Sequence, residues 1–497
     1  MKEIKVVLLY PPHQSWTDSM CKPNGSLAYP NLAGALQEIG VDVEVYDACV
    51  GNDKDDLDEV FYRSSELENG LIRTGVSDER ILQEVAEADI VGLTSIFSDQ
   101  ETMVLQCVKL IKSVFPDKFI IAGGVNARSR RSKFYQNGVD LICLSESEIT
   151  IQQIAFVLQK GQRNFSEIPG VAFQIDGSEC VNKITAEEVV WDLDKLPMPA
   201  WDMLPNERYW KIGRPHGGHF DQKKELRYAS MMTSTGCVFA CRYCHIAGET
   251  DNNGDSGPIG RFRAKSDERV LAELESLKSL GVKQIFLEDD SLFGRKKRMI
   301  RLMRKIQGLG FEIFAVNGVN IPHVLKNYSV DMDVVEALSE AGVKELSLPF
   351  ESGNQRILRK YANNKWDLEK SDIEILIRTY RDHGITICGN YMIGFPDETR
   401  KEIEQTIEMA RRHVGYGLNA ANFLLVLPLP GTPLYDEAVE GNYLDKDFDI
   451  DRMHWQKANM KNTAVAAHEL EEIRHNAWCE LNDASWVKYK TNMKATL

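Results

Sequence analysis

Three closely spaced cysteines have the clearest chemical potential in this sequence. The 497-residue chain has ten cysteines, and only Cys237, Cys241 and Cys244 are clustered, in the stretch TSTGCVFACRYCHIAGE. This C-x3-C-x2-C spacing directly follows a predicted strand, and three thiolates on one tight loop can ligate three irons of a [4Fe–4S] cluster. The fourth iron then lacks a protein ligand, and such an open position suits catalysis because a substrate can coordinate it.

Zinc and plain core thiols are the alternatives for this loop. Structural zinc sites take four ligands, commonly as two pairs. His245 directly follows Cys244 and would strain to reach the same metal. Cys107, Cys143 and Cys388 lie in apolar stretches and are typical of a core. The ligand count therefore favours the cluster.

An acidic triplet is the next candidate for chemistry. Glu288, Asp289 and Asp290 follow a predicted strand in the segment LEDDSLF, where carboxylates suit substrate positioning or proton transfer. An N-cap cluster for the following helix explains them equally well. The GRKKR run at 294–298 favours a solvated helix face, with an anionic substrate as the minor alternative.

The elements that position these residues fall into four predicted segments. Residues 1–165 alternate buried strands with helices, which predicts an α/β, doubly wound, Rossmann-like parallel sheet with ligands at its strand ends. Residues 166–228 form an ordered connector that begins with a hairpin turning at Asp176-Gly177. Six strand–helix units in 229–431 predict a partial (β/α)6 barrel with its chemistry at the strand ends. Residues 432–497 form a mainly helical tail.

Composition limits the partners. The net charge of −15 argues against nucleic acid, because a phosphate backbone needs a basic surface. No apolar run reaches the ~18 residues of a membrane span. The apolar run VVLLY near the N-terminus is followed at once by Pro11-Pro12, which favours a buried strand over a signal peptide. We therefore expect a cytoplasmic protein with a small-molecule substrate.

The cysteine loop, with Tyr243 in C-x3-C-x-Tyr-C, resembles the signature of radical S-adenosylmethionine enzymes. In that family the amino and carboxylate groups of S-adenosylmethionine chelate the open iron, and the cluster reduces the sulfonium to release a 5′-deoxyadenosyl radical. LPFESGNQRIL and GNYMIGFPDET resemble the family's ribose and adenine segments. The resemblance implies these ligands of the cluster-bound cofactor: Tyr243, Asn317, Glu351, Ser352, Asn390 and Met392.

The order of the two halves resembles the cobalamin-dependent, methylase class of these enzymes. Matching segments are YPPHQSW, TSIFSD, GGVNARS and LSESE, each after a strand of the first half. The D-x-H-x-x-G motif that supplies a cobalt-ligating histidine is absent, and His13 lacks its pattern, so no protein histidine ligand is expected. The implied cobalamin contacts are Pro11, Gln14, Thr94, Ser95, Gly123, Gly124, Val125, Asn126, Ser145 and Glu146.

The resemblance implies a methyltransferase that uses methylcobalamin to methylate an unactivated carbon, or phosphorus, of a small secondary metabolite. Flavodoxin or ferredoxin would be the electron donor. A cobalamin-dependent cyclase or rearrangement enzyme without methyl transfer is the alternative within radical chemistry. A non-catalytic corrinoid- or cluster-binding sensor is the alternative of another class. The acidic composition disfavours a tRNA-modifying enzyme.

Overall fold

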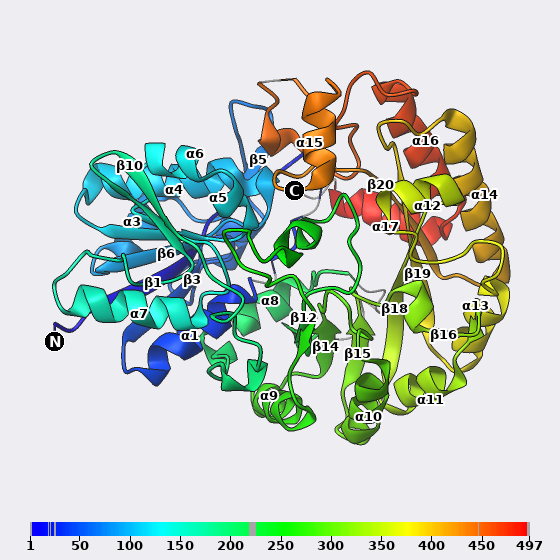
Figure 1. Cartoon of the computed structure of the whole chain (residues 1–497), viewed down its shortest axis with the longest axis horizontal. Coiled ribbons are helices and arrows are strands. Elements are labelled where there is room, and N and C mark those ends of the chain that lie inside the picture. Colours follow the sequence, from blue (N-terminus) through cyan, green and yellow to red (C-terminus); the bar gives the residue numbers. More distant parts are fainter. Residues whose placement is uncertain are drawn as a thin grey trace.

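Two main sheets lie side by side in the chain (Figure 1). The computed structural model describes residues 2–494 except 18, 20, 24, 25, 218–224 and 446. The first sheet and its helices occupy the left of Figure 1, and the second sheet curves through the right half. No helix in the described ranges is long and apolar enough to cross a membrane.

The first sheet has seven strands in the order β10-β9-β8-β7-β6-β1-β3. Its parallel strands are almost wholly buried, because helices cover both faces: α1 (Ala28–Glu38) and α7 (Glu148–Gln159) on one, α3 (Asp78–Val85) and α4 (Glu101–Val114) on the other. The strand order reverses between β1 and β6, where such sheets bind ligands. The predicted doubly wound sheet is confirmed, with parallel strands β1 (Lys5–Tyr10), β3 (Asp42–Asp47), β6 (Ile90–Thr94), β7 (Phe119–Gly123) and β8 (Leu141–Cys143).

The predicted hairpin belongs to this first sheet and not to the connector. Strands β9 (Val171–Ile175) and β10 (Ser178–Asn182) pair antiparallel, and β9 also pairs antiparallel with β8. Asp176 and Gly177 both have positive φ, 49° and 79°, as a tight two-residue hairpin turn requires. The first sheet is therefore mixed and extends beyond residue 165.

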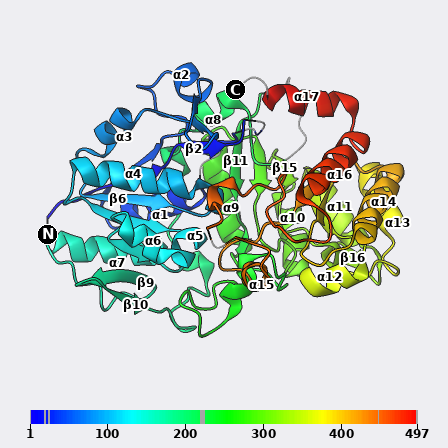
Figure 2. The same ribbon diagram turned by 90° about the horizontal axis from the view of Figure 1, so that it is seen from above.

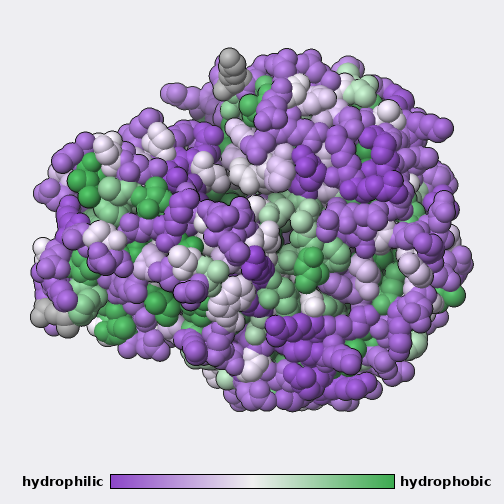
Figure 3. All heavy atoms as spheres, in the orientation of Figure 1, coloured by the Kyte–Doolittle hydropathy of each residue, from purple (hydrophilic) through white to green (hydrophobic). Residues whose placement is uncertain are grey.

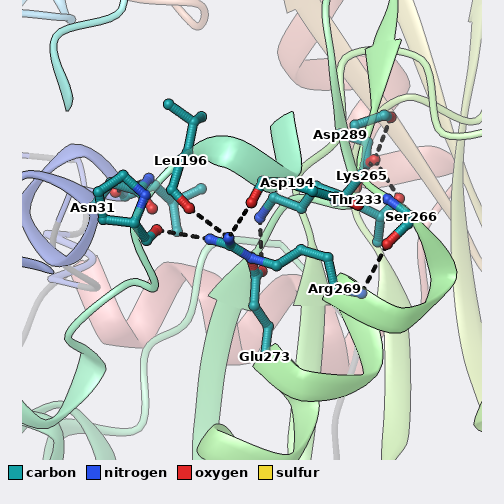
Figure 4. Close-up of polar contacts among 12 residues, drawn as sticks. Asn31, Asp194, Leu196, Thr233, Lys265, Ser266, Arg269, Glu273 and Asp289 are labelled. Carbon is teal, nitrogen blue, oxygen red and sulfur yellow. Dashed lines mark hydrogen bonds and ion pairs between the residues drawn. The ribbon is translucent and has the colours of Figure 1, made fainter. Parts of the chain in front are cut away.

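The connector is ordered where the structure describes it, as the sequence predicts. It includes η2 (Leu193–Lys195), η3 (Trp201–Met203) and α8 (Asn206–Ile212). Figure 4 shows how the barrel holds it: the guanidinium of Arg269, on α9 (Asp267–Ser279), donates to the carbonyl oxygens of Leu196 at 2.5 Å and Pro197 at 2.7 Å. Residues 218–224 of the connector lie outside the described part of the chain.

The second sheet has six parallel strands in the order β11-β14-β15-β18-β19-β20, so the predicted partial (β/α)6 barrel is confirmed. The first predicted strand, YASMMTST, is broken: β11 ends at Met231, and β12 (Ser234–Thr235) pairs with β13 (Arg263–Ala264) instead. The barrel strands are β11 (Tyr228–Met231), β14 (Gln284–Leu287), β15 (Glu312–Ala315), β18 (Val343–Glu351), β19 (Thr386–Ile393) and β20 (Ala420–Leu425).

Helices cover the outer face of this barrel and bury its apolar core. In chain order they are α9, α10 (Lys296–Ile306), α11 (Met332–Glu340), α12 (Gln355–Tyr361), α13 (Ile373–Asp382) and α14 (Arg400–Tyr416). The side of β18, β19 and β20 that faces the inside of the barrel is less buried than the side that faces the helices. Its alternate residues, among them Ser347, Asn390 and Asn422, remain partly exposed, so the barrel lumen is not filled by its own side chains.

The tail returns across both halves. Helix α15 (Pro433–Glu440) follows the last barrel strand, and α16 (Ala467–Glu480) packs on β20 before α17 (Ala484–Lys494) (Figure 2). Between α15 and α16, Asp451 accepts a hydrogen bond from the backbone N–H of Thr102 at 3.1 Å, and His454 lies 3.0 Å from Ser19 Oγ. The tail therefore links the barrel edge to the first sheet.

A small three-stranded sheet was not predicted. β2 (His13–Ser15), β5 (Ile72–Thr74) and β4 (Ser65–Glu66) pair in the order β2-β5-β4 beside the first sheet. Their short, polar sequences carry no alternation of apolar and polar residues that would mark a strand. Gln14, taken as part of a binding loop, is thereby fixed on a strand.

Candidate functional site

The cysteine loop begins with a turn that only glycine permits. Gly236 has φ 75°, and a Cβ there would lie 2.4 Å from the carbonyl oxygen of Arg261. Its N–H donates to Asp290 Oδ2 at 2.8 Å, and the N–H of Cys237 donates to the carbonyl of Gly260 at 2.9 Å. The chain therefore leaves β12 abruptly and presents the three thiols beyond the strand end.

The three thiols fit a cluster better than a single ion. Burial raises the pKa of Cys237 and of Cys241, and raises that of Cys244 to about 12, with mutual repulsion of the thiolates contributing. Thiolates here therefore need a strong positive partner. Within the described residues no three His, Cys, Asp or Glu side chains gather closely enough for one metal ion. Zinc ligation would require sulfurs about 3.8 Å apart, from Zn–S bonds of ~2.3 Å, whereas a cubane cluster takes one thiolate per iron.

Asp289 stabilises the backbone of the residues that precede this loop in the chain. It is fully buried and accepts hydrogen bonds from the N–H of Thr233 at 3.1 Å, from Thr233 Oγ1 at 2.8 Å and from Ser234 Oγ at 2.5 Å. Burial raises its pKa, and these donors together with Arg298 oppose the shift. These bonds to Thr233 and Ser234 give Asp289 a positioning role at the start of β12, and its predicted place among the catalytic groups stays a prediction.

Asp290 also supports the loop. Its Oδ2 accepts the Gly236 hydrogen bond, and burial, with repulsion from Asp289, raises its pKa to about 7. The N-cap alternative does not describe this segment, because α10 begins only at Lys296 and has no side-chain cap. The GRKKR run is not a simple solvated face either: Arg298 is buried and donates to the carbonyls of Thr233 at 3.0 Å and Lys265 at 2.8 Å.

Glu351 ends β18 in a strained conformation beside the cysteines. Its φ of 61° is unusual for a residue with a side chain. Its Oε1 accepts a hydrogen bond from Lys365 Nζ at 2.7 Å, in an ion pair whose two side chains are 6% and 7% exposed. Burial opposes the ammonium charge, but Glu351, Cys241 and Cys237 together raise the pKa of Lys365 above its usual range.

Sequence reasoning missed Lys365. It lies after α12 in the segment NNKWD, 14 residues beyond Glu351, with no flanking motif. The structure places its ammonium between the carboxylate of Glu351 and the thiols of Cys237 and Cys241. A buried positive charge at that point offsets the negative charge that a thiolate-ligated cluster brings.

The other predicted contacts of the barrel divide into two groups. Tyr243 is half-buried, and its buried hydroxyl faces Glu351 and Cys241. Asn390 and Met392 are partly exposed on the inward side of β19, and Asn390 Oδ1 accepts from Asn422 Nδ2 at 3.1 Å. Ser352 instead lies buried against Thr406 Oγ1, at 3.2 Å, and accepts from the N–H of Asn354. This gives Ser352 a place in the turn after β18, and its predicted contact with the cofactor stays a prediction.

At the edge of the first sheet, two buried acceptors have no partner among the described residues: Gln14 Oε1 and Asn126 Oδ1. Gly123 is open, since a Cβ there would meet nothing closer than 3.9 Å, and Ile96 and Phe97 just past β6 are 37% and 60% exposed. Open backbone, exposed apolar side chains and unsatisfied acceptors together fit a large, flat, amide-bearing macrocycle. Pro11, Thr94, Ser95 and Val125 lie at this same edge.

Three predicted contacts at this edge have other roles. A Cβ on Gly124 would lie 2.5 Å from the carbonyl of Ser95, so Gly124 allows two loops to meet. Ser145 Oγ donates to the carbonyl of Ser256 at 3.1 Å. Glu146 forms a bidentate ion pair with Arg263, at 2.6 Å for each oxygen. These residues join loops or halves, and their predicted contacts with cobalamin stay a prediction.

These contacts turn the strand ends of the two sheets toward each other. Arg263 begins β13, which pairs with the strand before the cysteine loop, and Arg128 of the first half forms a second ion pair with Glu249, just after the cysteines. In Figure 3 apolar and pale residues gather in the middle of the face shown, between the two halves, within a mostly hydrophilic surface. The cysteine loop is therefore held directly against the edge of the first sheet.

Glu288 differs from its two acidic neighbours. It lies at the end of β14 and accepts hydrogen bonds from Asn317 Nδ2, from Ser230 Oγ at 3.4 Å and from His216 Nδ1 at 3.2 Å if that nitrogen is protonated. Its side chain remains 11% exposed. Asn317 thus contacts Glu288, and its predicted contact with the cluster-bound cofactor stays a prediction.

The barrel is similar in sequence to a known family of enzymes. Residues 231–410 match the family model of the radical SAM superfamily. An uncharacterised methyltransferase of Pyrococcus horikoshii is 27% identical over 92% of this chain and 86% of its own length. The cytidylyl-2-hydroxyethylphosphonate methyltransferase of Streptomyces wedmorensis is 23% identical over 91% of this chain and 85% of its own.

A solved structure shares the whole architecture. The radical S-adenosylmethionine methyltransferase TsrM of Kitasatospora setae, with cobalamin and a [4Fe–4S] cluster bound, superposes with a TM-score of 0.66. It is 17% identical, and the match covers 89% of this chain and 78% of that protein. The shared fold includes both sheets in the same chain.

Proposed function

We propose that this chain, which belongs to the radical S-adenosylmethionine superfamily, is a cobalamin-dependent methyltransferase of a small-molecule substrate. The observation that carries the proposal is the direct clamping of the cysteine loop against the strand-end edge of the first sheet by the Arg263–Glu146 and Arg128–Glu249 pairs. Two cofactors held at these two edges would share one space. The related methyltransferases support methyl transfer over a cyclase or a non-catalytic sensor.

The residues present fit both cofactors. Cys237, Cys241 and Cys244 would hold the cluster, and Tyr243 and Glu351, beside these thiols, would contact S-adenosylmethionine. The first-sheet edge would hold cobalamin through the open backbone at Gly123, with the amide oxygens of Gln14 and Asn126, which have no partner among the described residues, accepting from its amide groups. When bound, the cluster supplies the electron that cleaves S-adenosylmethionine to a hydrogen-abstracting radical, and cobalamin supplies the methyl group.

The chain's own part is orientation and exclusion of water. Asp289 and Asp290 fix the turn from which the thiols project. Lys365 fixes the carboxylate of Glu351 and neutralises charge beside the thiols. The tail residues Asp451 and His454, bonded to Thr102 and Ser19, cover the seam between the halves. We expect a one-electron donor such as flavodoxin or ferredoxin, because radical methylation would consume two added electrons for each product, one for each cofactor.

Anaerobic reconstitution tests this proposal. The full chain, refilled with iron, sulfide and hydroxocobalamin, is expected to retain one cluster and one corrinoid through gel filtration. With S-adenosylmethionine and a reductant it should form 5′-deoxyadenosine. With a true substrate it should also form S-adenosylhomocysteine and a product heavier by CH2. Formation of 5′-deoxyadenosine and a product of unchanged mass would support the cyclase alternative instead.

A further inference from the structure

The basic run GRKKR and a second basic segment meet beside the cysteine loop. Residues 260–265 and 294–305 together hold ten lysines and arginines and no aspartate or glutamate, in a chain of net charge −15. A Cβ on Gly294 would lie 2.4 Å from Cε2 of Phe262, and the guanidinium of Arg295 lies over the same ring, 5.9 Å from its centroid. In Figure 3 strongly hydrophilic residues cover the lower part of the face shown, where Figure 1 draws α10. The two segments therefore form one surface.

Three cations of this surface have no counterion. Arg261, Arg295 and Lys297 are exposed, and none of them forms an ion pair with another described residue, whereas Lys296 pairs with Asp331 at 2.9 Å. Arg295 and Lys297 lie at the start of α10, where the helix dipole disfavours positive charge, and the first turn of α10 holds no acidic residue. These cations do not stabilise the helix, so their position favours a role toward a partner.

This surface is next to the first cysteine of the loop. The carbonyl of Gly260 accepts a hydrogen bond from the N–H of Cys237 at 2.9 Å. The carbonyl oxygen of Arg261 lies where a Cβ on Gly236 would meet it, at 2.4 Å. From Phe262, which is half-buried, the backbone path to Cys237 is two residues and one hydrogen bond. An electron that enters here has a short route to the thiols.

We propose that a small acidic electron-carrier protein, such as flavodoxin or ferredoxin, docks on the surface formed by Arg261, Phe262, Arg295 and Lys297. The inference rests on the proposed function, whose cluster takes its electron from such a carrier, and adds the place of docking. Complementary charge orients the carrier toward this surface although both proteins are acidic overall. Electron-transfer complexes are small, so a patch of this size is enough. The anion that the GRKKR run suggested is then a protein and not the substrate.

The test measures how fast flavodoxin hydroquinone reduces the cluster of the reconstituted full chain, followed anaerobically by rapid-freeze EPR. Each event moves one electron from the flavin to the cluster and leaves a flavin semiquinone. We expect the second-order rate constant to fall at least about tenfold between ~0.02 M and ~0.5 M salt. The double variant Arg295→Glu/Lys297→Glu should lower the low-salt rate constant by about tenfold or more. It should fold, because acidic residues are favourable at a helix start.

Two controls separate docking from other effects. The double variant Lys109→Glu/Arg412→Glu makes the same change of charge at exposed positions on α4 and α14 and should keep the parent rate constant. Photoreduced 5-deazariboflavin is a small uncharged reductant that needs no docking surface, so it should reduce the cluster equally fast in all three proteins.

A flavodoxin rate constant that ignores salt, or that is unchanged in Arg295→Glu/Lys297→Glu, would overturn the inference. Equal slowing of that variant with 5-deazariboflavin would overturn it too, because the cluster itself would then be altered. Loss of tRNA binding in the variant, with an unchanged flavodoxin rate constant, would assign the surface to nucleic acid instead. A chain that takes electrons from flavodoxin as expected yet transfers no methyl group would contradict the proposed function and leave this inference standing.

Discussion

The two strand-end edges that meet at the site are built on different principles. At the barrel edge, side chains with covalent or ionic capacity converge: three thiols, the Glu351–Lys365 pair and two buried aspartates that hold the loop. At the first-sheet edge, the charged residue Glu146 forms an ion pair with Arg263 of the barrel. The surface left at that edge consists of open backbone at Gly123 and exposed apolar side chains. The types of its residues therefore make a metal site recognisable in the sequence. A site for a macrocycle depends mostly on the shape of the backbone and of apolar side chains, which the sequence does not show directly.

The same contrast recurs within the acidic triplet. Asp289 and Asp290 accept hydrogen bonds from the segment that leads into the cysteine loop, at Thr233 and Gly236. Glu288 instead lies among Ser230, His216 and Asn317. Within one sequence motif, Glu288 therefore faces the barrel lumen, and Asp289 and Asp290 stabilise the backbone around the cysteine loop. Substitutions that separate these roles are the most direct way to test the comparison.

The largest effect is expected from the cluster ligands. Cys241→Ala removes one of three thiolates, and a cubane held by two is expected to be lost or labile. Iron and sulfide content should fall to background and 5′-deoxyadenosine formation should stop. The control Cys479→Ala removes an exposed thiol from α16 and should keep full iron content. A normal cluster spectrum in Cys241→Ala would refute the ligand assignment.

A large effect on stability separates Asp289 from Glu288. Asp289→Asn leaves donors of Thr233 and Ser234 competing for one oxygen in a buried site, which should lower the free energy of unfolding by about 3 kcal/mol and loosen cluster retention. Glu288→Gln should change that free energy by less than about 1 kcal/mol. Chemical denaturation with parallel iron analysis measures both. Equal destabilisation by the two variants would contradict the division of roles.

Removing the clamp should have an intermediate effect. Arg263 is 2% exposed and pairs with Glu146 in a bidentate geometry. Arg263→Met leaves a partly buried carboxylate unpaired, so we expect a loss of about 2–3 kcal/mol in the free energy of unfolding and weaker retention of corrinoid on gel filtration. Arg304→Met, on the exposed face of α10, is the matched control. Unchanged corrinoid retention in Arg263→Met would show that the clamp does not shape the first-sheet edge.

The smallest effect is a pH dependence at the carboxyl-terminal end of β3, in the first sheet. Asp47 is buried and accepts from Tyr209 Oη at 2.6 Å and from the N–H of Cys49 at 2.8 Å; burial raises its pKa to about 6. Because the folded state then binds the proton more tightly than the unfolded state, the free energy of unfolding falls as pH rises from about 4 to about 6, with a slope of at most ~1.4 kcal/mol per pH unit. Asp47→Asn should flatten that part of the stability–pH curve. An unchanged slope would exclude Asp47 as its source.

Much of the fold was predictable because both sheets carry continuous apolar strands separated by amphipathic helices. The cysteine loop was predictable because its spacing is local. The role of Lys365 was not, because it depends on groups distant in sequence, the thiols and Glu351. The contacts that Glu146 and Ser145 make with Arg263 and Ser256 could not be predicted for the same reason, since these partners lie over 100 residues away.

The transfer of a methyl group between the two edges is the central claim, and one measurement tests it without knowledge of the substrate. The reconstituted chain is incubated anaerobically with reductant and S-adenosylmethionine whose methyl group is CD3, and the corrinoid is recovered in the dark for mass spectrometry. The account predicts a corrinoid that co-elutes with the protein and carries CD3. A corrinoid that washes out, or that is retained but returns unlabelled, would contradict it.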